Sequence, residues 1–315
     1  MRATKTPLII ETKKKISNIL SNSGSNEIIT YNFVSSDLLN KASQDANIAY
    51  HIKNAISPEL EYMRPSLIPS LIDKLQMNLN KGHKEVSLFE TNISHQKGVM
   101  NEEELPLECW YLSFIYSNKD SNTFNGSSYY MAKRYLEKVL NGLGIHSVKY
   151  ILCIDYDLEN SSIWLKNISN SFDLNTSAVI STDKGKVLGI LGNLANTVKE
   201  NFTLPAYTCA FEINISELIS LEDGQIYKKE PVYPAISRDI CFSVGENIKY
   251  SEIKDELMKI LNTDELHSQM ECLDIYKAKE QDNTRKITFR ISVQSYKKKI
   301  RKSTRLNSSH RIRSR

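Results

Sequence analysis

Two kinds of apolar periodicity take turns along this chain, and their order constrains the fold more than any other feature. Apolar residues three and four apart predict helices over residues 6–24 and 66–80, and a third from Ser127 or Ser128 to Gly144. Apolar residues two apart predict strands over residues 27–33, 84–90, 109–116, 148–154 and 208–213. Residues 178–181 and 187–191 flank Asp183-Lys184-Gly185, which indicates a hairpin. Helices mixed with hairpins predict an α+β domain with a mostly antiparallel sheet rather than a doubly wound fold.

The first helix and the strand after it carry the most detailed local signals. Thr6 is the expected helix cap, Pro7 the first helical residue and Gly24 the left-handed exit. The strand over residues 27–33 is expected to be buried on at least one side, because three apolar residues share one of its faces. Those residues are Ile29, Tyr31 and Phe33.

A charged stretch without periodicity, residues 221–231, predicts a domain boundary. We expect a core over 1–222, a linker over 223–230, a second domain over 231–296 and a tail over 297–315. In the second domain, strand, helix, strand and strand are predicted over residues 239–244, 251–261, 267–276 and 286–294. This βαββ order is the first part of a ferredoxin-like βαββαβ unit. We expect the incomplete unit to be marginally stable alone, since one sheet edge and one face stay uncovered.

Length and composition are those of a globular protein of about two domains. The chain has 315 residues, 40% of them hydrophobic and 25% charged, which excludes a fully disordered or collagen-like chain. Its five cysteines lie far apart, a pattern that suits a reducing compartment. Apolar runs fall short of the roughly 20 residues of a membrane helix, and the N-terminal residues do not resemble a signal peptide. We therefore predict a cytoplasmic protein with no membrane partner.

The net charge of +4 comes from the end of the chain. Residues 296–315 hold nine Lys or Arg and no acid, and the remaining 32 basic and 37 acidic residues give the rest a charge of −5. A basic tail can bind nucleic acid through its phosphates. Residues 303–310 also look like a translated sequencing adapter, which would make the tail an assembly artefact. Both interpretations stay open.

Familiar catalytic motifs do not occur in the sequence. It holds no phosphate-binding G-x-x-x-x-G-K-[ST] loop, no G-x-S-x-G elbow and no H-E-x-x-H helix. Its six histidines stand singly and are expected to be structural or superficial. Asp155 and Asp157 follow an apolar strand without a third oxygen ligand nearby, so a solvated strand end is favoured over a metal site. We predict no catalytic residue and no metal ligand in this chain.

Several segments, taken in order, resemble the C-terminal part of the bacterial phenylalanyl-tRNA synthetase beta subunit. Residues 27–35, EIITYNFVS, are similar to the family's EVITYSFVS strand, and residues 54–59 and 63–71, NAISPE and MRPSLIPSL, are similar to its NPLS and LRTSLLPGLL segments. The segments NLNKG at 78–82 and LFE at 88–90 continue in the same order. LGILG at 188–192 resembles the family's IGxLGxLHP hairpin, and YPAISRDI at 233–240 resembles the FPAVRRDIS entry to its anticodon-binding domain.

The resemblance implies a class II synthetase-like core that has lost catalysis, followed by a ferredoxin-like anticodon-binding domain. The family enzyme is an (αβ)₂ heterotetramer that uses ATP and Mg²⁺ to activate phenylalanine and charge tRNA(Phe). By this resemblance the partners are the alpha subunit and tRNA(Phe), and ATP and Mg²⁺ act through the alpha subunit, with no cofactor in this chain.

The chain also departs from the family. By this resemblance the match begins at the core, and we expect the chain to lack the family's N-terminal tRNA-binding, editing and magnesium-associated domains. Where the family has Gly-Arg after the LFE strand, this chain has Thr91-Asn92-Ile93-Ser94. An active class II site needs an arginine there to hold a phosphate bidentately. The glycine-rich arginine motif that completes the ATP site is also missing, so we expect the isolated chain not to form aminoacyl-adenylate.

Arg64 and Arg238 are candidate binding residues, each with an open alternative. Arg64 is predicted at the subunit interface, bridging a carboxylate of the alpha subunit; an internal salt bridge that caps the helix from Ser66 is the alternative. Arg238 is predicted to contact an anticodon phosphate. Its alternative is an ion pair with Asp239 or Asp274 that fixes the strand.

The remaining tRNA-binding candidates lie on the strands of the second domain. Lys286 and Arg290 are four apart on one strand and therefore share a face, which could meet RNA or simply be solvated. Tyr233 and Tyr276 could stack on bases, although aromatic residues at strand ends are also typical of a core. For the whole chain, the alternatives to a synthetase subunit are a truncated, non-enzymatic tRNA- or protein-binding module and an independent enzyme of the same class.

Overall fold

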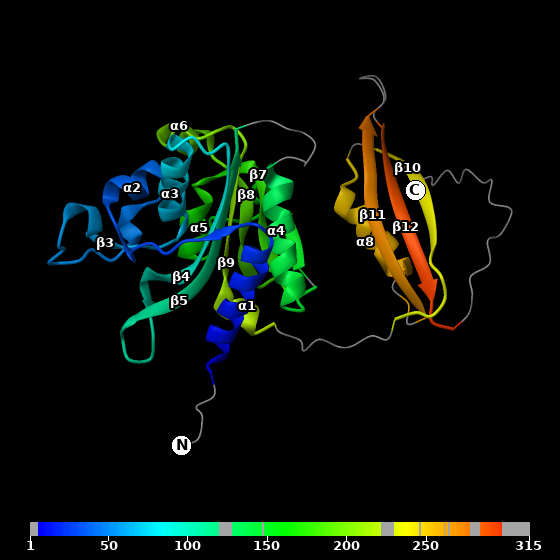
Figure 1. Cartoon of the computed structure of the whole chain (residues 1–315), viewed down its shortest axis with the longest axis horizontal. Coiled ribbons are helices and arrows are strands. Elements are labelled where there is room, and N and C mark those ends of the chain that lie inside the picture. Colours follow the sequence, from blue (N-terminus) through cyan, green and yellow to red (C-terminus); the bar gives the residue numbers. More distant parts are fainter. Residues whose placement is uncertain are drawn as a thin grey trace, which may run out of the picture. The chain divides into compact units, whose positions relative to one another are not determined.

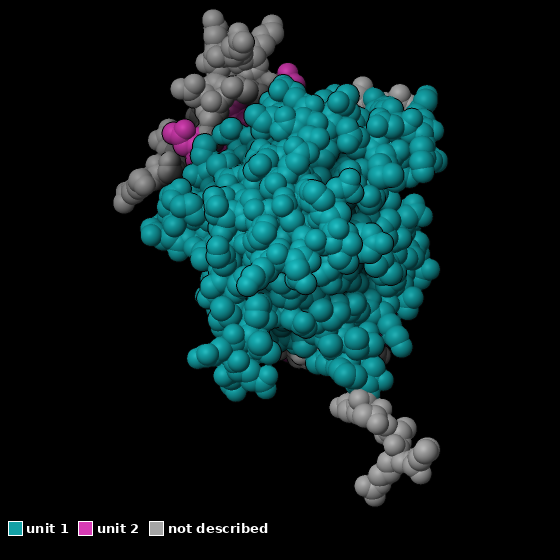
Figure 2. Space-filling view, turned by 90° about the vertical axis from the view of Figure 1, so that its left-hand side faces the viewer, with its two compact units in different colours: residues 1–225 teal, residues 226–315 magenta. Residues whose placement is uncertain are grey.

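The computed structural model describes residues 6–119, 128–146, 148–221, 230–245, 247–261, 263, 265–277 and 284–297. The chain divides into two compact units, residues 1–225 and 226–315, which are coloured separately in Figure 2. Residue 127, most of the predicted linker and the tail from residue 298 lie outside the described residues. Within the described ranges, no helix is long and apolar enough to cross a membrane.

The first unit is built on a seven-stranded sheet (Figure 1). From one edge to the other, the strands are β1 (Asn26–Glu27), β4 (Glu85–Met100), β5 (Pro106–Asn118), β9 (Thr208–Asn214), β8 (Val187–Leu194), β7 (Phe172–Thr182) and β6 (Val148–Leu152). All neighbours are antiparallel except β1 and β4, which are parallel. The predicted α+β fold with a mostly antiparallel sheet is confirmed, including the 178–191 hairpin, whose turn residue Gly185 has φ +82°.

Helices cover both faces of this sheet, which makes three layers (Figure 1). One face packs against α1 (Leu8–Asn22), α4 (Ser128–Gly142) and α7 (Ile215–Ile219). The other packs against α3 (Ile68–Asn80), α5 (Ile163–Ser169) and α6 (Asn196–Asn201). The short helices α5, α6 and α7 were not predicted, because five to seven residues are too few to establish a helical period.

Smaller elements flank this sandwich. They are α2 (Ser36–Lys41), the two-stranded sheet of β2 (Phe33–Val34) and β3 (Tyr62–Met63), and 3₁₀ turns at Ala46–Ile48, Pro58–Leu60 and Cys153–Asp155.

The long helices follow from their apolar stripes. In α3, Leu71, Leu75 and Leu79 are buried against the sheet, and the proline of its first turn is harmless because that turn needs no amide donor. Helix α1 begins at Leu8, so Pro7 is the cap position and not, as predicted, the first helical residue. Gly24 has φ +94° and provides the predicted left-handed exit.

Strand β8 needs a glycine at position 189, where its backbone lies close to that of the neighbouring strand β9. A Cβ atom on Gly189 would overlap the carbonyl oxygen of Glu212 and lie 2.9 Å from the Cα of Ile213. Backbone atoms of a central strand cannot move aside cheaply, so only a residue without a side chain fits. The close approach keeps β9 and its Glu212 side chain tight against the neighbouring strand.

The prediction of a strand over residues 27–33 was wrong. Only Asn26 and Glu27 pair with β4, and the segment that follows is held in another way. Ile29 and Tyr31, predicted to share a buried face, are 87% and 76% exposed. Beyond Ile28, which packs against the core, the inward side chains are the polar Thr30 and Asn32, which reverses the usual relation between apolar character and burial.

The second unit has the predicted βαββ order: β10 (Ile236–Gly245), α8 (Tyr250–Leu261), β11 (Leu266–Lys277) and β12 (Thr284–Ser295). The strands form an antiparallel sheet in the order β10-β12-β11 (Figure 1). Ile287, Phe289 and Ile291 are buried on the face that packs against α8, where the rings of Tyr250 and Phe289 stack 5.6 Å apart.

Candidate functional site

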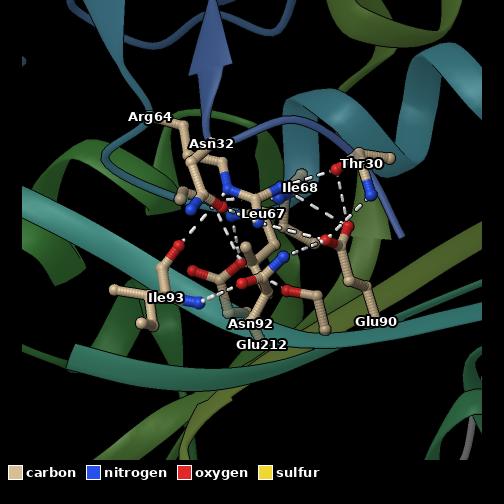
Figure 3. A network of polar contacts seen from close by, with 11 residues as sticks. Thr30, Asn32, Arg64, Leu67, Ile68, Glu90, Asn92, Ile93 and Glu212 are labelled. Carbon is tan, nitrogen blue, oxygen red and sulfur yellow. Dashed lines mark hydrogen bonds and ion pairs between the residues drawn. The ribbon is translucent and has the colours of Figure 1, made fainter. Parts of the chain in front are cut away.

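Arg64 lies in the interior of the first unit, directly before the turn into α3 (Figure 3). Its side chain is 0% exposed, and its guanidinium contacts four other residues. It meets the Glu90 carboxylate with two N–H groups, at 3.1 and 3.4 Å. It also donates to Thr30 Oγ1 at 2.6 Å, Asn32 Oδ1 at 3.0 Å and the Ile93 carbonyl at 3.3 Å. A buried arginine with this set of acceptors is fully engaged within its own chain.

Glu90 completes this cluster from strand β4, which lies next to β1 (Figure 3). Its carboxylate accepts hydrogen bonds from the Thr30 amide at 3.1 Å, the Thr30 hydroxyl at 2.7 Å and Asn92 Nδ2 at 2.8 Å. Asn92 and Ile93 stand at the segment where the family has Gly-Arg. Here they help to hold an internal ion pair instead of supplying a phosphate ligand.

These contacts change the interpretation of Arg64. The predicted bridge to the alpha subunit is disfavoured, because a side chain with no exposed surface has no atom left for a second protein. The internal ion pair is the alternative that the structure favours. Its partner is Glu90, however, and the beginning of α3 is capped by other groups.

A second carboxylate, Glu212 of β9, provides that cap. It is fully buried and accepts hydrogen bonds from the Leu67 amide at 2.8 Å, Ser66 Oγ at 3.2 Å, Trp164 Nε1 at 3.0 Å and Ser113 Oγ. Burial raises the pKa of the Glu212 carboxyl above its usual value, and the hydrogen bonds offset only part of this effect. Glu212 therefore ties α3, α5 and β5 to one central strand.

Both carboxylates lie on the sheet face covered by α3 and α5, since Leu88 and Ala210, two residues before them, pack into that core. The cation on this face is already paired, and α3 and α5 take up the surface of the sheet. Two carboxylates beside a neutralised arginine would repel a triphosphate. The residues present on this face do not fit ATP.

Metal-binding groups are equally poorly represented. Among the residues that the structure describes, no cluster of three or more His, Cys, Asp or Glu could hold an ion. Asp157 instead accepts hydrogen bonds from the amide and side chain of Asn160, the nearer at 2.7 Å, and these bonds lower the pKa of its carboxyl.

The surface next to Arg64 is unusually apolar. We call Ile29, Tyr31 and Phe33 the apolar strip; their side chains are exposed while Thr30 and Asn32, between them, turn inward to Arg64 and Glu90. Alternation of apolar residues toward solvent and polar residues toward the interior is the reverse of an ordinary sheet edge. Exposed apolar side chains grouped in this way are typical of a protein–protein contact.

In the second unit, the structure separates the predicted tRNA-binding residues. Lys286 and Arg290 both lie on the sheet face opposite α8, because they alternate with the buried residues of β12. Arg238 is paired with Ile291, and paired residues of antiparallel strands point to the same side of the sheet, so the Arg238 side chain leaves the backbone on the face that packs against α8. Its guanidinium reaches toward the Ser237 carbonyl at 3.5 Å, where Ser237, Arg238, Asp239 and Arg290 line a shallow depression.

Arg290 differs from Lys286 in its charge environment. Both its Nε and Nη2 meet the Asp239 carboxylate at 2.8 Å, and these hydrogen bonds lower the pKa of Asp239. Asp239 thus pairs with Arg290 and not with Arg238. Lys286 lies between Ser243 on β10 and Tyr276 on β11, and Tyr276 is exposed. Tyr233 precedes β10, and its carbonyl is 3.5 Å from Gln294 Nε2.

Sequence reasoning missed both buried glutamates. Each stands inside an apolar strand, in LFE at residues 88–90 and in AFEIN at residues 210–214. A charged residue in a strand that is otherwise buried on both faces must find partners inside, and this signal could have identified both.

The fold resembles that of solved structures. Two solved pyrrolysyl-tRNA synthetases from Desulfitobacterium hafniense match it with TM-scores of 0.52 and 0.53, at 14% and 13% sequence identity. Each match covers 69% of this chain, and the matches cover 67% and 70% of the respective solved chains. The first unit therefore has the fold of a class II aminoacyl-tRNA synthetase core.

Residues 2–215 match the family model described as "Phenylalanyl tRNA synthetase beta chain CLM domain", and residues 231–314 match the "Ferredoxin-fold anticodon binding domain". The chain belongs to the phenylalanyl-tRNA synthetase beta chain family.

Curated relatives carry corresponding names. The chain is 31% identical to a chloroplastic phenylalanine–tRNA ligase beta subunit of Phaeodactylum tricornutum over 85% of its length, and 27% identical to the beta subunit of Clostridium acetobutylicum over 86%. It covers 36% and 32% of those two proteins, so it spans about a third of the length of these relatives.

Proposed function

We propose that this chain acts as the C-terminal part of a phenylalanine–tRNA ligase beta subunit and supports ATP-dependent charging of tRNA(Phe) without catalysing it. The observation that carries the proposal is the synthetase-type sheet face, whose arginine is locked onto Glu90 and whose surface is covered by α3 and α5. A face filled from within leaves nucleotide chemistry to a second subunit. In this proposal the alpha subunit uses ATP and Mg²⁺, and the complex is an (αβ)₂ heterotetramer.

The proposal is tested by activity of the purified chain. We expect no phenylalanine-dependent exchange of pyrophosphate into ATP by the chain alone, and exchange by its complex with the alpha subunit. ATP binding by the isolated chain would instead support an independent enzyme. The predicted cytoplasmic location stays a prediction, and one of the relatives is chloroplastic.

The apolar strip is the proposed docking surface for the alpha subunit. We expect Tyr31→Asp to weaken association with the alpha subunit at least about tenfold, because a charge would be desolvated at the contact. Tyr31 is 76% exposed, so the substitution should leave the melting temperature of the chain unchanged. Titration calorimetry with purified alpha subunit measures the effect. Tyr207→Asp, at a tyrosine 45% exposed outside the strip, is the control. If both variants weaken association with the alpha subunit equally, or if neither weakens it, the apolar strip is not the docking surface.

The open face of the second unit, which carries Lys286 and Arg290, is the proposed contact with the anticodon region of tRNA(Phe). Arg238, which starts from the other face, and Tyr233, which precedes β10, are the further proposed tRNA-binding residues. We expect Lys286→Ala to reduce tRNA affinity about three- to tenfold and to lower the salt dependence by about one phosphate contact. Arg290→Ala should have a smaller effect, because Asp239 already neutralises its charge. Lys259→Ala, on the exposed surface of α8, is the control for the other face; like Arg290, Lys259 is ion-paired, with Glu256. Filter binding at several salt concentrations measures these effects. A larger loss of tRNA affinity in Lys259→Ala than in Lys286→Ala would show that tRNA binds a different face.

A further inference from the structure

The part of the apolar strip with Ile29 and Tyr31 lies between two strand pairings, because β1 ends before it and Phe33 already belongs to β2, which pairs with β3. Strand β1 ends at Glu27, and Ile28 donates one further backbone bond to the Phe89 carbonyl, at 2.9 Å. Beyond that point, the Thr30 amide is bound by the Glu90 carboxylate, and the Asn32 carbonyl accepts from the Arg64 amide at 3.0 Å. At Thr30 the Glu90 side chain therefore takes the place of a neighbouring strand, and at Asn32 backbone pairing with the β3 segment begins.

The geometry of the guanidinium decides which way the segment faces. Arg64 presents its planar fork to Thr30 Oγ1 and Asn32 Oδ1, which are two residues apart, while both ends of the fork also meet Glu90 (Figure 3). Holding residues 30 and 32 inward turns the residues between and beside them outward, because neighbouring side chains of an extended segment point to opposite sides. The outward residues are the apolar strip.

We propose that the buried Arg64–Glu90 pair is a positioning device that presents the apolar strip to the alpha subunit, so that two interior side chains set the affinity of the subunits for each other. The inference rests on the proposed function, which supplies the partner: the named relatives are beta subunits, and the strip is an exposed apolar surface next to the edge strand β1 of the sheet. Neither Arg64 nor Glu90 touches the partner. Each acts through the segment that it holds.

The conservative variant Thr30→Val tests this role without leaving a buried charge unpaired. It keeps the shape of the side chain but removes the hydroxyl that donates to Glu90 at 2.7 Å and accepts from Arg64 at 2.6 Å. We expect about a tenfold or greater loss of affinity for the alpha subunit and faster hydrogen exchange in residues 28–33, with the melting temperature of the chain changed by only a few degrees.

Ser113→Ala is the matched control. Like Thr30→Val, it removes a hydroxyl that donates to a buried carboxylate on the same sheet face, but the carboxylate is Glu212, which does not contact the strip segment. We expect this variant to lower the melting temperature by a similar amount and to bind the alpha subunit with unchanged affinity. Arg64→Lys, which keeps the charge but loses the fork, should behave like Thr30→Val.

The outcomes separate the inference from the function on which it rests. Weakened association by Thr30→Val together with normal association by Ser113→Ala supports the positioning role. Equal affinities of Thr30→Val and Ser113→Ala for the alpha subunit overturn the positioning role. In that case a loss of association in Tyr31→Asp would still support the docking surface. If Tyr31→Asp leaves association with the alpha subunit intact, the apolar strip is not the docking surface. Self-association of the chain that Tyr31→Asp abolishes would show a second copy as the occupant and overturn the inference.

Discussion

Arg64→Ala is expected to lower the free energy of unfolding of the first unit by roughly 3–5 kcal/mol. The substitution leaves the carboxylate of Glu90, which is 1% exposed, without its counter-charge in the interior. Water cannot solvate it there without opening the structure, so the desolvation cost of the ion is no longer offset. Urea denaturation of the full chain, followed by circular dichroism, measures the change.

Two comparisons show whether burial is the cause. Lys41→Ala breaks an ion pair with Asp37 that has the same 3.1 Å separation, but its partners are 50% and 74% exposed, so the expected loss is below about 1 kcal/mol. Replacing both Arg64 and Glu90 by Met should recover much of the lost stability, because no charge then remains inside. A loss below about 1 kcal/mol in Arg64→Ala would mean that the Glu90 carboxylate reaches solvent in the variant.

Glu212→Ala is the second substitution with a large expected effect, about 3 kcal/mol or more. It leaves donors from Leu67, Ser66, Trp164 and Ser113 without an acceptor, and each unsatisfied buried group costs about 1–3 kcal/mol. The change also disconnects the beginning of α3 from β9. Glu85→Ala, which removes one hydrogen bond from Tyr116 at 2.8 Å in the outer part of β4, should cost far less. Similar losses in the two variants would contradict the role of Glu212.

The pH dependence of stability gives an independent check on Glu212. Because burial raises the pKa of its carboxyl in the folded state, the folded chain binds this proton more tightly than the unfolded chain does. The contribution of Glu212 to stability is therefore largest below its unfolded pKa of about 4.3 and falls as the pH rises through the folded pKa. Wild type should gain stability relative to Glu212→Gln as the pH is lowered from 8 to 5. A constant difference over this range would show that the hydrogen bonds outweigh burial.

The two units differ in how well their sequence patterns predict structure. In the second unit, alternating residues of β12 identified both its position and its faces, because the buried residues Ile287, Phe289 and Ile291 are all apolar. In β12 the residues that share the apolar face are also the buried ones. In residues 29–33 the period is equally clear, but the polar members turn inward, so the pattern predicts which residues share a face and not which face is buried.

The candidate site depends on contacts between residues far apart in the chain. Arg64, Glu90 and Thr30 come from three segments, and Glu212 lies about 145 residues beyond the Leu67 amide that it caps. A single sequence contains no signal for such pairings, which explains why Arg64 was assigned to a subunit interface and Glu90 and Glu212 were overlooked. Their only local trace is a glutamate inside an apolar strand.

The sequence by itself determined the order of helices and strands, the mostly antiparallel α+β architecture and the family to which the chain belongs, because periodicity and ordered motifs are local properties. Only the tertiary structure decided that Arg64 is an interior residue, that the synthetase-type face is filled by the chain's own helices and that Ile29 and Tyr31 face outward. The physical reason is that the energetics of a buried charge depend on its partners. Those partners are brought together by the fold, and here they reverse the direction that hydrophobicity alone would favour.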